Sequence, residues 1–114
     1  MNTGQGSVNH NDDQQFIVHV NESKIQIIIR NTSLDYNSTP AFHDIIDSHI
    51  DKNLKEWEVD FSGVVFLDSS GLGLMARLSK VLDSQKSKLI IKKARNEIVI
   101  LLLTSGFTKN VTFI

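Results

Sequence analysis

The sequence predicts an α/β fold, in which a mostly parallel central sheet is covered by helices. Short runs rich in β-branched and aromatic residues recur along the chain, and segments with apolar residues at helical spacing separate them. Strands that alternate with helices in this way favour parallel pairing through right-handed βαβ crossovers. With 114 residues, 40% of them hydrophobic, the chain has material for one core, and we expect a single domain over residues 15–114.

The N-terminal segment differs in composition from the rest. Residues 1–14 are rich in Asn, Gly, Gln and Asp and show no apolar periodicity, which is typical of a flexible tail. The folded domain is therefore expected to begin at residue 15.

Two strands joined as a hairpin are expected first. Phe16–Val20 and Lys24–Arg30 are β-rich, and the polar tripeptide Asn21-Glu22-Ser23 between them favours a turn. From Lys24 to Ile27 polar and apolar residues alternate, as they do in a strand with one face in water.

A helix and a third strand should follow. Thr39-Pro40 predicts a helix start, because proline is favoured at the first helical position. The apolar positions after it repeat at helical spacing. They are Phe42, Ile45, Ile46 and Ile50, and His49 repeats at the same spacing. Trp57, Val59 and Phe61 then alternate with other residues, which predicts a strand.

A second long helix is expected from Gly71 to about Ser84. Its apolar positions form one stripe that should be buried. They are Leu74, Met75, Leu78, Val81 and Leu82. The other face should continue from Ser69 and Ser70 along the helix, and it carries Gly73, Arg77, Lys80 and Ser84.

The C-terminal part should contain a strand, a short helix and a last strand. Lys88–Lys92 predicts a strand, and Val111 and Phe113 mark another. By periodicity alone residues 96–103 fit a buried strand or a helix, but Gly106 stands where a helix C-cap would, which favours the helix. A short helix cannot bury all of Ile98–Leu103, so part of this block should be an exposed docking surface; additional core is the alternative.

The most informative segment joins an apolar run to the second long helix. It reads Val64 to Met75, with Asp68-Ser69-Ser70-Gly71 at its centre. The acid or either hydroxyl would cap the first turn of the helix, and a phosphate would be tolerated there, at the positive end of the helix dipole. Gly71 and Gly73 leave room for another molecule to approach. A simple helix cap is the alternative, but glycines cost up to about 1 kcal/mol each inside a helix, which disfavours it.

These residues resemble the STAS domain family, specifically the bacterial anti-sigma factor antagonists (anti-anti-sigma factors) of partner-switching pathways. The resemblance runs from about Phe16 to the C-terminus, and residues 59–73 resemble the family's strand, loop and phosphorylation-site signature. Ser105-Gly106-Phe107 is a second match, and Leu34-Asp35 followed by Ser38-Thr39 is a weaker third. The family also has a helix where residues 96–103 lie.

The sequence departs from the family at two places. Thr32 stands where many members have a glycine, so the loop before Leu34-Asp35 is expected to differ in shape. Many relatives continue into a C-terminal helix where this sequence ends at Ile114, so we expect either a minimal variant of the family or an open surface where that helix would lie.

The resemblance implies a phosphorylation switch at Ser69, with Ser70 as the alternative site. In the family, the unphosphorylated antagonist binds an anti-sigma factor that is also a serine kinase of the GHKL type, and it is released when the kinase phosphorylates the serine. A PP2C-type serine phosphatase reverses the modification. Beside the phosphosite, the residues expected to bind the partner are Asp35, Asp68, Ser70, Gly71, Leu72, Gly73 and Arg77.

Two other functions remain open within the family. The domain could be a STAS regulatory subunit of a phospholipid-transport ABC complex, docked on its ATPase, although Ser69-Ser70 favours the phosphoswitch. A partner-switch regulator of a non-sigma output, such as one acting on a response regulator, is equally compatible with the sequence.

Composition and motifs disfavour other classes of function. The chain has no cysteine and a net charge of −1, so it offers no thiol nucleophile, no thiolate metal site and no basic surface for nucleic acid. It has no nucleophile elbow, P-loop or dinucleotide fingerprint, and its histidines (His10, His19, His43 and His49) lack metal-site spacing. We expect a non-enzymatic cytoplasmic protein without cofactor or metal, and without a signal peptide or membrane-inserted segment.

Overall fold

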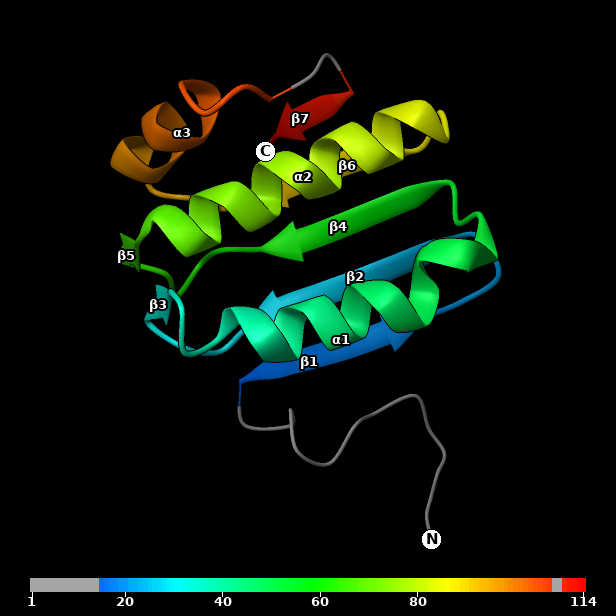
Figure 1. Cartoon of the computed structure of the whole chain (residues 1–114), viewed down its shortest axis with the longest axis horizontal. Coiled ribbons are helices and arrows are strands. Elements are labelled where there is room, and N and C mark those ends of the chain that lie inside the picture. Colours follow the sequence, from blue (N-terminus) through cyan, green and yellow to red (C-terminus); the bar gives the residue numbers. More distant parts are fainter. Residues whose placement is uncertain (1–14, 108–109) are drawn as a thin grey trace, which may run out of the picture.

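The computed structural model describes residues 15–107 and 110–114, and its centre is a five-stranded sheet with the order β1-β2-β4-β6-β7 (Figure 1). The strands are β1 (Phe16–Val20), β2 (Lys24–Ile29), β4 (Glu56–Asp60), β6 (Lys88–Lys92) and β7 (Val111–Phe113). β1 pairs with β2 antiparallel, and the pairs β2–β4, β4–β6 and β6–β7 are all parallel. The predicted hairpin and the predicted mostly parallel sheet are confirmed. The predicted tail, residues 1–14, lies outside the described residues.

Within the described residues, three α-helices accompany the sheet: α1 (Thr39–His49), α2 (Ser69–Ser84) and α3 (Asn96–Leu103), and the 3₁₀ turn η3 (Ile50–Lys52) extends α1. In Figure 1, α1 and α2 lie in front of the sheet and α3 lies near α2. The helical interpretation of residues 96–103 is confirmed; Thr104 ends α3, and Gly106 follows with φ of 90°. Within the described part of the chain, no helix is long and apolar enough to cross a bilayer.

The core lies between the sheet and the helices. Alternate side chains of the three central strands point toward α1 and α2 and are fully buried. They are Ile25, Ile27, Trp57, Val59, Leu89 and Ile91. Phe42 and Ile45 of α1 and Leu74 and Leu78 of α2 join this cluster. Val81 was predicted to be buried in the same stripe of α2, but its side chain is 36% exposed because it faces a groove between α1 and α2.

The opposite face of the sheet carries a line of ion pairs. The Lys24 ammonium lies 3.2 Å from Glu56 and 3.0 Å from Glu58, and Lys92 lies 3.6 Å from Glu58. Burial raises the pKa of Glu58, but hydrogen bonds from Gln26 and Lys24 and the charges of Lys24 and Lys92 outweigh burial and lower the pKa overall. The alternation predicted for β2 therefore separates an apolar face from a charged one.

A second, two-stranded sheet was not predicted. It pairs β3 (Ser33–Leu34) with β5 (Phe66–Leu67) in parallel, and Leu34 is the register partner of Leu67. Strands of two residues carry no periodicity that a sequence pattern could reveal. This small sheet joins the loop before α1 to the loop before α2, and so it sets the position of the site described next.

Candidate functional site

The candidate site lies where β3 and β5 end. Because Leu34 and Leu67 are partners in parallel strands, the two acids that follow them, Asp35 and Asp68, emerge at the same edge. The Asp68 N–H donates to the Leu34 carbonyl at 3.3 Å, and the Tyr36 N–H donates to Asp68 Oδ2 at 3.1 Å. Two loops that are distant in sequence are thus held together at the start of α2.

Asp68 is the N-cap of α2. Its Oδ1 accepts hydrogen bonds from the Ser70 N–H at 2.8 Å and from the Gly71 N–H at 3.0 Å. Of the three residues that the sequence offered as caps, the acid therefore takes the role, because its extended backbone (φ −96°, ψ −176°) directs the carboxylate at these two donors. With Oδ2 bound to Tyr36, both carboxylate oxygens have structural partners.

Ser69 is the first residue of α2, and its side chain is exposed. Its hydroxyl makes no hydrogen bond with any other described residue. Because Asp68 caps the helix, the Ser69 hydroxyl is left for solvent or another molecule, at the positive end of the α2 dipole. Ser70, the alternative site, is half-buried.

Gly71 does not have the role that the sequence suggested. It is buried, and a Cβ at this position would overlap the Leu34 carbonyl oxygen and lie 2.8 Å from Leu67 Cδ1. The missing side chain thus makes room for the small β3–β5 sheet against α2, and the expectation that Gly71 opens space for a partner is wrong. Gly73 is exposed, and a Cβ there would meet nothing within 4 Å, so the surface at this turn of α2 is open.

Comparison with known proteins places this arrangement in a family. The family profile described as "Mlab, STAS domain" matches residues 21–113, which is most of the chain. The chain belongs to the STAS domain family. No curated protein matches the sequence significantly.

Solved structures show the same fold. The anti-sigma factor antagonist SpoIIAA in its unphosphorylated form is 18% identical and matches with a TM-score of 0.68 over 81% of this chain and 84% of its own. A candidate anti-sigma factor antagonist from Thermotoga maritima is 16% identical and matches with a TM-score of 0.67 over 91% of this chain and 89% of its own. Both likenesses are of fold, and they confirm the predicted STAS fold.

Asp35 is tied into its own loop of this STAS domain. Its carboxylate accepts hydrogen bonds from the Ser33 hydroxyl and the Asn37 N–H, each at 3.0 Å. The Ser33 hydrogen bond lowers the pKa of Asp35, partial burial opposes it, and the bonds from Asn37 and Ser38 add to the lowering. Asp35 therefore shapes the loop that holds Asp68.

The remaining residues predicted for partner binding lie further along α2. Leu72 is half-buried against the hydrophobic core, whereas Arg77 is exposed two turns after Ser69. Ser69, Gly73 and Arg77 are spaced four residues apart, so they lie along one face of the helix, as expected.

Exposed apolar side chains that no sequence pattern predicted flank Asp68 and Ser69. Tyr36, whose N–H binds Asp68, is 69% exposed, and Phe66 of β5 is 55% exposed. Phe66 alternates with buried Leu67, as strand geometry requires, but a strand of two residues carries no sequence periodicity that could have revealed this exposure. Large apolar side chains at this density favour a protein-binding surface.

The apolar block of α3 is divided between core and surface. Ile98 and Leu102 are buried, whereas Ile100, Leu101 and Leu103 are exposed. Part of the block is therefore exposed, as expected; its use in docking stays a prediction.

The histidines of α1 have ordinary surroundings. His49 is buried, with Nδ1 at 2.8 Å from the Ile45 carbonyl oxygen, and His43 is half-buried. Among residues 15–107 and 110–114, no group of three or more His, Asp or Glu side chains could hold a metal ion. His10 lies outside these ranges.

Proposed function

We propose that this STAS domain is an anti-sigma factor antagonist in a partner-switching pathway. In its unphosphorylated form it binds an anti-sigma factor that is also a GHKL-type serine kinase. Phosphorylation of Ser69 by that kinase releases it, and a PP2C-type phosphatase restores the binding form. The names of the two structural relatives support this class of function, although each name describes the relative itself.

The observation that carries the proposal is the separation of tasks between Asp68 and Ser69. The acid caps α2 through two backbone N–H groups, while the neighbouring hydroxyl is exposed and has no partner within the described residues. A kinase can therefore modify Ser69 without displacing a contact on which the fold depends.

Phosphorylation would change the surface far more than the fold. A phosphate adds about −1.5 to −2 charges, which the N-terminus of a helix tolerates. The same charge beside exposed Tyr36 and Phe66 would oppose burial of this surface against a partner, because an unpaired buried charge is costly. The half-buried Asp68 adds a negative charge of its own.

Variants of the two serines test the proposal. Ser69→Ala should change the free energy of unfolding by less than about 0.5 kcal/mol, because the hydroxyl has no structural partner, and it should bind the kinase as wild type does. Ser69→Glu should keep the melting temperature and weaken binding about a hundredfold, or about 2.7 kcal/mol. Ser70→Ala and Ser70→Glu are the matched controls.

The measurement combines phosphopeptide mapping with binding assays on the purified kinase. Label at Ser69, its absence in Ser69→Ala and its removal by the phosphatase support the switch. Label confined to Ser70, or wild-type affinity of Ser69→Glu, would rule Ser69 out as the switch.

A second function is favoured by one finding. The family profile that matches is described as "Mlab, STAS domain", a description different from that of the two structural relatives. The second candidate function is therefore that of a regulatory STAS subunit docked on the ATPase of a phospholipid-transport ABC complex. Co-purification of the tagged chain with an ATP-binding transport subunit, undiminished in Ser69→Glu, would favour this function over the phosphoswitch.

A further inference from the structure

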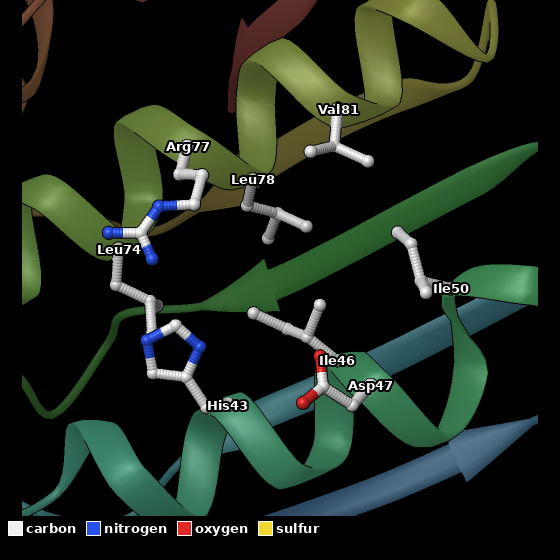
Figure 2. Close-up of a pocket in the computed structure, with 8 residues that line it drawn as sticks. All are labelled: His43, Ile46, Asp47, Ile50, Leu74, Arg77, Leu78 and Val81. Atoms are coloured by element: carbon white, nitrogen blue, oxygen red, sulfur yellow. The ribbon is translucent and has the colours of Figure 1, made fainter.

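A groove lies between α1 and α2. Figure 2 draws the eight side chains that line it, which come from the two helices and from η3. They are His43, Ile46, Asp47, Ile50, Leu74, Arg77, Leu78 and Val81. The volume is about 310 Å³, at the lower end of the range of sites for small molecules.

The floor and walls of the groove are aliphatic. Leu74 and Leu78 are buried at its base, Ile46 and Ile50 are half-buried on the α1 side, and Val81 is 36% exposed on the α2 side. Half-exposed aliphatic side chains on both walls leave apolar surface that a ligand could cover. This explains why the predicted apolar stripe of α2 is incompletely buried.

Opposite charges line the same groove without pairing. Arg77 of α2 and Asp47 of α1 are both exposed, and neither makes an ion pair or hydrogen bond through its side chain with another described residue. All the ion pairs within the described ranges join Lys24 or Lys92 to Glu56 or Glu58, on the sheet. In Figure 2 the Arg77 guanidinium lies at the His43 end, and Asp47 stands one turn further along α1.

We propose that this groove binds a small zwitterion with an apolar body, of which leucine and phenylalanine are the simplest examples. Arg77 would hold the carboxylate, because a planar guanidinium pairs with it through two parallel hydrogen bonds. Asp47 would accept the ammonium, and the apolar body would lie over Ile46, Leu78 and Val81. Because neither charged group is paired with another side chain in the described structure, the ligand does not have to break an ion pair in order to bind.

Charge complementarity sets the specificity. A ligand with a carboxylate alone would leave Asp47 unpaired close to its own negative charge, and an amine alone would face Arg77 in the same way. Only a ligand with both groups satisfies both walls. The groove shares Arg77 with the predicted partner surface but does not involve the Ser69 hydroxyl, and ligand binding to it can be measured without the kinase or phosphorylation.

Titration of the isotope-labelled chain with phenylalanine, followed by amide NMR, tests the proposal. Shifts should be confined to residues 43–50 and 74–81. Phenylalanine should bind at least about tenfold more tightly than either 3-phenylpropionate or 2-phenylethylamine, which each lack one charge. Because this comparison uses only the wild-type chain, it does not depend on the folding of any variant.

Charge-removing variants identify the two residues. Arg77→Gln and Asp47→Asn should each weaken phenylalanine binding at least about tenfold. Lys80→Gln and Asp44→Asn change exposed charges on the same helices outside the groove, and they should leave the affinity for phenylalanine unchanged. Equal affinity for all three ligands, or amide shifts confined to other residues, would overturn the proposal.

Discussion

Asp68 and Ser69 are neighbours in the sequence, but they face different surroundings. The carboxylate binds three backbone N–H groups, from Tyr36, Ser70 and Gly71, while the hydroxyl points to solvent. The sequence could predict that a cap and an exposed hydroxyl would occur at this junction. It could not assign them, because Asp and Ser are comparably good caps and the choice depends on a contact with a loop 32 positions away.

The two glycines after the serines should respond oppositely to the same substitution. Gly71→Ala should lower the free energy of unfolding by about 1–3 kcal/mol, because the added methyl overlaps Leu34 and crowds Leu67. Gly73→Ala should raise it by up to about 1 kcal/mol, because the position is open and helical, where alanine is favoured over glycine. Urea denaturation of both variants beside wild type measures the difference.

Equal effects of the two substitutions would contradict this account of α2. In particular, a Gly71→Ala variant as stable as wild type would mean that α2 does not pack closely on the β3–β5 sheet.

Among the elements, α3 shows how far an apolar pattern can be interpreted. Its composition predicted that not every side chain of Ile98–Leu103 could be buried, but the pattern could not say which ones face outward, since all six positions are apolar. The structure decides it through packing: Ile98 and Leu102, four residues apart, face the core. The β3–β5 sheet was beyond prediction because two-residue strands exist only through their tertiary pairing.

Alanine substitutions of two adjacent leucines in α3 should affect stability and partner binding differently. Leu102→Ala should lower the free energy of unfolding by about 2–5 kcal/mol, because Leu102 is fully buried. Leu103→Ala should change it by less than about 0.5 kcal/mol but weaken kinase binding by about 1 kcal/mol or more, because Leu103 is exposed. Thermal melts and binding assays on both variants provide the measurement.

The binding assays test whether the exposed side of α3 takes part in docking. If alanine at each of Ile100, Leu101 and Leu103 leaves kinase affinity unchanged, the exposed side of α3 is not part of the interface.

At the scale of the whole molecule, the two faces of the sheet differ in what holds them together. One face is covered by helices and apolar, and the other is crossed by the ion pairs of Glu58. Apart from β3 and β5, the strands follow from short β-rich runs, and their mostly parallel pairing follows from the preference for βαβ crossovers, so the fold class could be predicted from sequence. The groove between α1 and α2 could not be predicted, because it depends on how the two helices pack on the sheet and against each other.

The ion pairs should make stability depend on acidity. The pKa of Glu58 is lowered below its ordinary value of 4.5, so its contribution is fully present above about pH 4.5 and is lost as the pH falls through the folded-state pKa below that value. Glu58→Gln should therefore lose less stability than wild type between about pH 6 and pH 3. Urea denaturation across this range is the measurement, with the exposed Glu22→Gln as control.

Parallel pH profiles for wild type and Glu58→Gln would show that this carboxylate is not stabilised in the folded state. The lowered pKa of Asp35 should leave part of the acid sensitivity in the variant.

The strand order also bears on how the chain is assembled during synthesis. In the sheet order β1-β2-β4-β6-β7, each strand lies beside the one that precedes it along the chain within that sheet. A growing polypeptide can therefore add each strand to an edge that already exists, beginning with the local β1–β2 hairpin, and no early strand must wait for the last one. Short separations between pairing segments reduce the loop-closure entropy that slows folding. The α2 helix, which begins at Ser69, is made before β6, so its N-terminus can dock on the β3–β5 pair while the C-terminal strands are still being translated.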